Sequence, residues 1–262
     1  ARRAPGPDRR RPPAAAVTTE VTRTAAPPVD DPYIGLTHFT EEYVEFFFGR
    51  DEESGLIIGN LRASRLTLLY AESGVGKSSV LRAGVVARLH EVADRDLQGG
   101  GHPRLVPVVF SSWSERPLAL LVEAIAEAIR PYLGGAAMPE LPEDDLEAAL
   151  EAAGQSLDAT LLVILDQFEE HLLYRDAEPQ PDRVAAQIAR CVNRPDLRAN
   201  FLISIREDSY AELGDLFRGK IKNVYGNFLH LDFLDRAGGR NAIEGPIARV
   251  NELQPEAEPF SV

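Results

Sequence analysis

From Asp31 onward, short apolar runs alternate with segments whose apolar residues recur at helical spacing. Five runs are typical of strands, and they cover residues 66–70, 105–110, 161–165, 201–205 and 228–233. Between them, apolar residues share one helical face within 118–129, 146–153 and 184–192. Because the runs are apolar throughout rather than alternating, they suit a parallel sheet covered by helices on both faces. The pattern predicts an α/β domain with three layers.

The first 30 residues differ from the rest in composition, with six prolines, six arginines and no aromatic residue. Such a segment buries too little apolar surface to offset the entropy of ordering it. We therefore expect a disordered linker at 1–30, a folded core at 31–234, and the truncated start of a helical extension at 235–262. The chain begins with Ala rather than Met, which favours a piece of a longer polypeptide; removal of an initiator Met is the alternative.

Composition excludes several classes of protein. No stretch approaches the roughly 18 apolar residues of a membrane span. Cys191 is the single cysteine, so neither an internal disulfide nor a cysteine-rich zinc site can form. The formal net charge of −13 would repel nucleic-acid phosphates. These observations predict a cytoplasmic protein without a membrane or a direct nucleic-acid partner.

A glycine-rich loop follows the first strand-like run and reads AESGVGKSS over 71–79. It fits the phosphate-loop template G-x-x-x-x-G-K-[ST] at the last three positions, whereas Ala71 stands at the first. Glycines let backbone N–H groups turn around a phosphate, Lys77 can bridge the outer phosphates, and the Ser78 hydroxyl can bind Mg²⁺. The expected nucleotide-binding residues are Ser73, Gly74, Val75, Gly76, Lys77, Ser78 and Ser79. Glu72 would lower the affinity unless its carboxylate points to solvent.

Acidic residues follow another buried run. Asp166 stands directly after residues 161–165, where it would hold Mg²⁺ together with Ser78. Glu170 is the first candidate and Glu169 the second for the general base that activates the attacking water. The alternative is that this pair is only the acidic first turn of a helix.

A basic residue ends the run at 201–205. Arg206 would emerge beside the γ-phosphate and contact it, and the alternative is a surface ion pair with Asp208. Residues 193–196, NRPD, loosely imitate a guanine-reading element, but they end a helical pattern, so we expect ATP rather than GTP.

Taken together, these motifs resemble the bacterial novel-STAND group of P-loop NTPases. The matching segments are PYIGL at 32–36, FTEE at 39–42, FFFGRD at 46–51, SGVGKSS at 73–79, LRAG at 81–84, DQFEE at 166–170, IRED at 205–208 and AIEGP at 242–246. The resemblance implies an AAA-related sheet of strand order 5-1-4-3-2 that binds ATP or ADP with Mg²⁺. It also implies that Phe48, Gly49 and Arg50 help to seat the adenine; a core cluster with a capping arginine is the alternative. Trp113 has no motif around it and is expected in the core.

The resemblance further implies a signalling switch with slow ATP hydrolysis. Members of this group carry a winged-helix module and sensor domains after the NTPase core, with an effector at one end. We expect nucleotide to control self-association and an effector outside this fragment, in bacterial defence or regulation. Two alternatives stay open. One is a nucleotide-binding scaffold that never hydrolyses, which Ala71 and Glu72 motivate; the other is an AAA-like motor.

Overall fold

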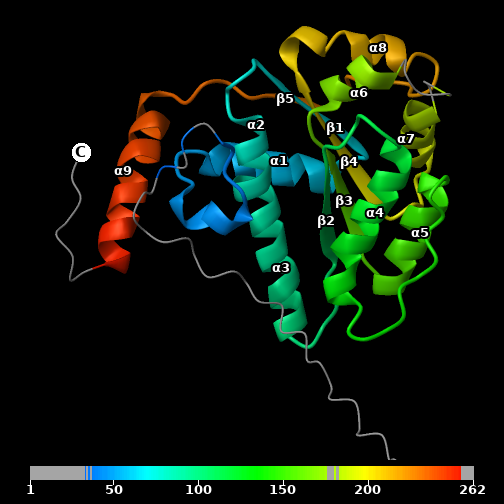
Figure 1. Cartoon of the computed structure of the whole chain (residues 1–262), viewed down its shortest axis with the longest axis horizontal. Helices are drawn as coiled ribbons and strands as arrows, with labels where there is room; N and C mark the ends of the chain where they lie inside the picture. Colours follow the sequence, from blue (N-terminus) through cyan, green and yellow to red (C-terminus); the bar gives the residue numbers. More distant parts are fainter. Residues whose placement is uncertain (1–32, 34, 36, 176–179, 181–182, 255–262) are drawn as a thin grey trace, which may run out of the picture.

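The computed structural model describes residues 33, 35, 37–175, 180 and 183–254 (Figure 1). The predicted linker at 1–30 and the last part of the predicted extension, 255–262, lie outside them, and the domain boundaries stay predictions. Within the described residues, five parallel strands form one sheet of order β2-β3-β4-β1-β5. Read from the other edge, this order is the predicted 5-1-4-3-2. The strands are β1 (Leu66–Ala71), β2 (Leu105–Phe110), β3 (Thr160–Leu165), β4 (Ala199–Arg206) and β5 (Phe228–His230).

Helices cover both faces of the sheet and complete the predicted three layers. One face carries α1 (Asp51–Ala63) and a continuous helix made of α2 (Lys77–Ser79), the π-helical η2 (Val80–Val86) and α3 (Ala87–Gln98). The other carries α4 (Pro117–Ile129), α5 (Leu146–Leu157), α6 (Phe168–Tyr174), α7 (Arg183–Asn193) and α8 (Glu212–Leu216). Short 3-10 helices are η1 (Glu41–Phe46), η3 (Arg130–Tyr132) and η5 (Glu207–Ser209). The last described helix is α9 (Arg236–Leu253).

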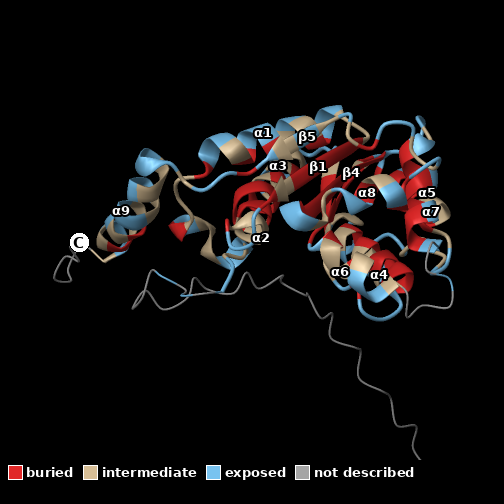
Figure 2. Cartoon of the chain, turned by 90° about the horizontal axis from the view of Figure 1, so that it is seen from above, coloured by how far each residue is buried: buried red, intermediate tan, exposed pale blue. Residues whose placement is uncertain are grey.

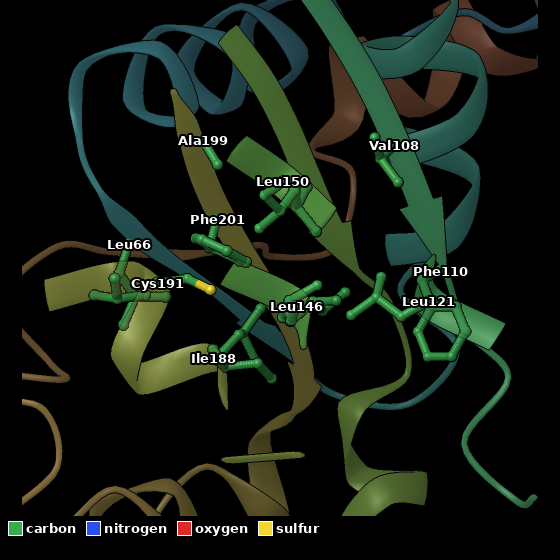
Figure 3. Packing of buried hydrophobic residues seen from close by; sticks show 14 of the residues in the cluster. Leu66, Val108, Phe110, Leu121, Leu146, Leu150, Ile188, Cys191, Ala199 and Phe201 are labelled. Carbon is green, nitrogen blue, oxygen red and sulfur yellow. The ribbon is translucent and has the colours of Figure 1, made fainter. Parts of the chain in front are cut away.

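The central strands are buried on both faces, as Figure 2 shows in red. In β3, Leu161 and Val163 pack toward α4, α5 and α7, whereas Leu162 packs toward α1 and α3. Figure 3 shows the first of these clusters, where Phe201 and Val108 of the sheet meet helix residues such as Leu146 and Ile188. The absence of polar alternation in the sequence thus reflects two covered faces.

The edge strand β5 is shorter than expected. The apolar run at 228–233 predicts six residues, but β5 ends at His230. This strand pairs with β1 alone, and Phe228 and Phe233 are exposed. An edge strand has one neighbour to hold it, so the chain leaves the sheet early and turns toward α9.

Among the described residues, none of the helices combines the length and the apolar character that a membrane span requires.

The α9 helix stands beside the sheet rather than on it (Figure 1). It packs against the segment before α1, where the Tyr33 hydroxyl donates to the Ile243 carbonyl at 2.6 Å and Arg249 pairs with Glu45 at 2.8 Å. Its first turn is capped by the carboxylate of Asp235. This packing brings α9 next to the glycine-rich loop.

Candidate functional site

The glycine-rich loop joins β1 to the helix that begins at Lys77. Gly74 and Gly76 have φ of +84° and +98°, a conformation that side chains disfavour. A Cβ at either position would meet no atom within 4 Å, so the positive φ rather than lack of room favours glycine here. Ala71, where the template has glycine, is a buried residue of β1 that needs no positive φ. Glu72 is exposed, so its carboxylate can point to solvent and away from a bound phosphate.

The lysine of the loop lies across its own backbone. Its Nζ donates to the carbonyl oxygens of Ala71 at 3.2 Å and Glu72 at 3.4 Å. Burial lowers the pKa of Lys77, and the nearby carboxylates of Glu169 and Asp166 oppose that shift. The ammonium group is therefore close enough to Asp166 and Glu169, the residues predicted to bind Mg²⁺ and to activate water, for their charges to act on it.

Asp166 directly follows β3, and both its carboxylate and its backbone carbonyl accept hydrogen bonds. It is 2% exposed, and its Oδ1 accepts from the N–H of Gln167 at 2.9 Å. Gln167 has a φ of +53°, so the chain turns sharply here before α6 begins. The indole N–H of Trp113 donates to the Asp166 carbonyl at 2.8 Å.

Trp113 was predicted to be a core residue, and it is buried as predicted. Its ring lies edge-on to Phe110 and Phe168, with centroids 4.8 and 4.9 Å away. Its contact with the Asp166 backbone is a role that the sequence reading missed. The residues beside Trp113 carry no motif, so only the fold reveals this contact.

The two glutamates at the start of α6 have different surroundings. Glu169 Oε2 accepts from the backbone N–H of Arg206 at 3.2 Å, which ties α6 to the end of β4. Burial raises the pKa of Glu169, while hydrogen bonds from backbone N–H groups and the charge of Lys77 lower it. Glu170 is half-buried, and its N–H closes the first helical turn onto the Gln167 carbonyl at 2.9 Å. Of the two, Glu169 is the one that accepts a hydrogen bond from Arg206 and whose pKa is affected by the charge of Lys77.

Arg206 lies opposite Ala71 in the pairing of β4 with β1, so it stands beside the start of the loop. Its guanidinium donates to Asp208 Oδ2 at 2.5 Å. The ion pair that the sequence left open as an alternative is therefore present. Arg206 is nevertheless close enough to the loop to affect the pKa of Lys77. We call the loop 71–79 with Asp166, Glu169 and Arg206 the phosphate side of the site.

A cavity of about 170 Å³ adjoins the loop on the side of η1 and α9. It is smaller than a typical pocket for a whole drug-sized ligand, about 300–1,000 Å³, and thus suits a single ring system such as a base. We call it the base side; its lining includes Phe47, Phe48, Val75, Ser79, Leu234 and Ala242. The Ser79 hydroxyl accepts from the N–H of Phe39 at 3.1 Å, which ties the preceding segment to the loop helix.

Close glycine contacts seat α9 against the base side. A Cβ on Gly245 would lie 2.5 Å from the ring of Phe48, and one on Gly49 would collide with the Gly238 carbonyl. Gly49 also has a φ of +85°. Gly238 and Gly245 are seven residues apart, so they share one face of the helix. Phe48 and Gly49 therefore both contact α9, and Phe48 also lines the cavity.

Arg50 is almost fully buried, and its guanidinium is engaged by protein groups. It pairs with Glu53 at 2.6 Å and donates to the carbonyl of Val75 at 3.3 Å and of Asp232 at 2.8 Å. Arg50 thus joins the phosphate loop to the segment that leads into α9.

A larger hollow of about 450 Å³ lies nearby, between the start of α1 and the start of α9. Its rim carries the carboxylates of Asp51, Glu52, Glu53 and Asp235. Glu53 pairs with Arg50 and Asp51 with Arg88, but the lining stays more acidic than that of the smaller, mostly apolar cavity, which is therefore the better candidate for the base.

The sequence matches the family model described as Novel STAND NTPase 1 over residues 32–259. The chain belongs to this novel STAND NTPase family. No curated protein matches the sequence.

Solved structures with the same fold include a Walker-type ATPase and two ORC proteins. The Walker-type ATPase PABY2304 of Pyrococcus abyssi is 18% identical with a TM-score of 0.56, over 84% of this chain and 62% of that one. The ORC2 protein of Aeropyrum pernix, solved as ADPNP–ADP complexes, is 18% identical with a TM-score of 0.53, over 80% and 54%. The ORC1 protein of the same organism, solved with DNA, has a TM-score of 0.50 at 18% identity, over 80% and 51%. The chain thus spans less than two thirds of each.

The residues of this STAND NTPase fit a magnesium nucleotide. The donor set of one hydroxyl, Ser78, and one buried carboxylate, Asp166, is made of the oxygen ligands that Mg²⁺ prefers. Within the described residues, no group of three or more His, Cys, Asp or Glu could hold a metal ion. The phosphates of the nucleotide and water would supply the remaining oxygen ligands of Mg²⁺.

Proposed function

We propose that this STAND NTPase binds ATP with Mg²⁺ and hydrolyses it slowly, as a switch. The observation that carries the proposal is the convergence of Lys77, Asp166, Glu169 and Arg206 at the carboxyl ends of β1, β3 and β4. A P-loop site needs a cation for the phosphates, a carboxylate for the metal and a carboxylate for water, and these residues supply them.

The position of residues 193–196 favours adenine over guanine as the base. NRPD at 193–196, the segment that imitates a guanine-reading element, lies before β4 begins, whereas the phosphate loop follows the end of β1. Because β1 and β4 are parallel, NRPD lies at the amino ends of the strands and the phosphate loop at their carboxyl ends. Asp196 is also paired with Arg194 at 3.2 Å. ATP is therefore the nucleotide we propose.

In this mechanism Lys77 contacts the outer phosphates, and Ser78 and Asp166 hold the metal. Mg²⁺, when bound, supplies positive charge that offsets the phosphates. Glu169 takes the proton of the attacking water, since its raised pKa brings it closer to the working pH than an ordinary glutamate. Glu170 remains the second candidate for the base. Arg206 contacts the γ-phosphate and reports its presence.

The packing of α9 supports a switch rather than a simple hydrolase. α9 contacts Phe48 and Gly49, and Arg50 connects the segment before α9 to the phosphate loop. A nucleotide between these parts can bias the position of α9 and of any domain that follows it. We propose that this bias controls self-association and an effector outside these residues, in defence or regulated signalling.

Nucleic acid is not a partner in this proposal. The likeness to ORC1 of Aeropyrum pernix concerns the fold, and a net charge of −13 repels phosphate backbones. The second candidate function is a nucleotide-binding scaffold without hydrolysis. It is favoured by the ion pair that engages Arg206.

Two measurements on the full natural polypeptide decide between switch and scaffold. Single-turnover hydrolysis of ATP should exceed the background of Lys77→Ala, and calorimetry should show that Arg206→Ala weakens ATP more than ADP. A wild type with no turnover above that background, together with no ATP/ADP difference in Arg206→Ala, would replace the switch by the scaffold.

A further inference from the structure

The ion pair between Arg206 and Asp208 lies at the end of β4. Arg206 is the last residue of the strand, and Asp208 is in the 3-10 helix η5 that follows directly. Arg206 Nη2 donates to Asp208 Oδ2 at 2.5 Å, and the two side chains are 44% and 61% exposed. The guanidinium is thus engaged by a carboxylate but accessible to other ligands.

This pair is close to the phosphate loop. Arg206 is the register partner of Ala71, whose carbonyl accepts from Lys77 Nζ at 3.2 Å. The charges of Arg206 and Asp208 both act on Lys77, in opposite directions. An anion bound at the loop would therefore meet the guanidinium and the carboxylate together, and the two would act on it with opposite sign.

A guanidinium binds a carboxylate and a phosphate through the same fork of N–H groups. We propose that Asp208 competes with the γ-phosphate of ATP for Arg206 and thereby sets how strongly the protein prefers ATP to ADP. ADP has no γ-phosphate and leaves the ion pair intact. The inference rests on the role that we propose for Arg206 as the γ-phosphate contact.

The strength of the pair limits the size of the effect. Exposed ion pairs contribute at most about 1 kcal/mol, which corresponds to about a fivefold change in affinity. Asp208 would therefore lower the affinity for ATP by up to about fivefold without preventing ATP from displacing it. Asp208 would thus adjust the preference between ATP and ADP, whereas nucleotide binding itself would depend on the loop.

The test is Asp208→Asn, which keeps the size of the side chain and removes its charge. Calorimetry with Mg²⁺ and a non-hydrolysable ATP analogue should show binding about three- to fivefold tighter than wild type. Binding of Mg·ADP should stay unchanged. The matched control is Asp215→Asn. It removes the same charge from another exposed ion pair, between Asp215 in α8 and Arg218, which follows α8. It should change neither affinity.

A double-mutant cycle with Arg206→Ala shows whether the gain acts through Arg206. The gain should vanish in Arg206→Ala with Asp208→Asn. Equal tightening of ADP, or the same gain without Arg206, would reduce the effect to the loss of one negative charge and overturn the inference. Weaker binding of the ATP analogue in Asp208→Asn would mean that Asp208 orients Arg206, and it would overturn the inference too.

The outcome for the proposed function is read separately. Arg206→Ala alone tests whether Arg206 contacts the γ-phosphate. If it weakens the ATP analogue more than ADP while Asp208→Asn has no effect, the proposed function stands and the competition is refuted. If it weakens both equally, the proposed role of Arg206 fails and the competition fails with it.

Discussion

The phosphate side and the base side of the site are built in different ways. The phosphate side uses the carboxyl ends of β1, β3 and β4, which the pairing of buried strands fixes relative to one another. The base side uses two segments outside the sheet, at 39–50 and at 234–245, which meet through close contacts of glycines. The sheet therefore holds the charged groups still, whereas the walls of the base cavity can move with α9.

This difference indicates where binding and switching reside. Strand ends inside a packed sheet move little, because repacking the interior is costly. A helix held by one face and a few surface ion pairs costs less to displace. We therefore expect changes on the phosphate side to alter binding and chemistry, and changes on the base side to alter how α9 responds to nucleotide.

The largest expected effect comes from Lys77→Ala on the phosphate side. Removing two charge-assisted hydrogen bonds to phosphate, each about 1.5 kcal/mol, should weaken ATP by about 100-fold or more. Fluorescence anisotropy with a labelled ATP analogue measures it. Lys222→Ala, on an exposed residue before β5, is the control and should bind like wild type. Unchanged binding in Lys77→Ala would refute the phosphate-loop assignment.

The next effect separates the two glutamates of α6. Glu169→Gln should keep ATP affinity and reduce single-turnover hydrolysis by about 100-fold, the usual scale for losing a general base. Glu170→Gln should reduce it less, because Glu169 is the residue linked to Lys77 and Arg206. The opposite ranking would restore Glu170, the first candidate from the sequence.

The pH dependence of hydrolysis tests the same residue. The pKa of Glu169 is raised, so its carboxylate takes up a proton at a higher pH than an ordinary glutamate would. Hydrolysis should therefore fall as the pH is lowered, beginning above the usual range of a glutamate. The single-turnover rate of Glu170→Gln should still fall at low pH in the same way. If this fall disappears in Glu170→Gln, Glu170 is the group that titrates.

On the base side, Gly245→Ala should have an intermediate effect. The new Cβ would lie 2.5 Å from the Phe48 ring, so α9 or Phe48 must shift. Overpacking of this kind costs about 1–3 kcal/mol, and we expect ATP and ADP to weaken alike by about tenfold. Gly239→Ala is the matched control on the same helix, because a Cβ there meets nothing within 4 Å. Equal affinities in both variants would mean that α9 does not shape the base cavity.

The two sides also differ in how far the sequence alone predicts them. The phosphate loop, Asp166 and Arg206 each follow an apolar run, and parallel strands bring such ends together, so their meeting was predictable. The strand order came from the family resemblance and is confirmed by the sheet. By contrast, the contact of Gly245 with Phe48 joins residues almost 200 positions apart. No local pattern encodes it, so the resemblance could name Phe48, Gly49 and Arg50 but not their contacts.

The sequence left two details of the fold and the site open to correction, each for a physical reason. The apolar run at 228–233 looked like a full strand, but an edge strand with one neighbour ends at His230. The ranking of Glu170 before Glu169 stays a prediction, because spacing alone cannot show which carboxylate turns toward β4. That choice depends on the left-handed turn at Gln167, a residue type that gives no warning of a positive φ.

The smallest expected effect concerns Trp113, which lies behind the phosphate side. Trp113→Phe keeps an aromatic ring between Phe110 and Phe168 but removes the N–H that donates to the Asp166 carbonyl at 2.8 Å. A buried acceptor left without its donor costs about 1–3 kcal/mol of stability. Since the same backbone carries the carboxylate for Mg²⁺, we expect the Mg²⁺ concentration needed for half-maximal ATP binding to rise by a few fold. Affinity at saturating Mg²⁺ should stay the same.

A loss of stability alone would not move that Mg²⁺ midpoint, so the titration distinguishes positioning from packing. Asp166→Asn sets the upper limit, since it removes the ligand itself and should leave ATP binding with little dependence on Mg²⁺. The change in the Mg²⁺ dependence of ATP binding should be smaller in Trp113→Phe than in Asp166→Asn. If the midpoint of Trp113→Phe equals that of wild type while its melting temperature drops, the indole hydrogen bond stabilises the core and does not tune the metal site. The phosphate side would then depend on the strand ends alone, which is the sharpest form of its contrast with the base side.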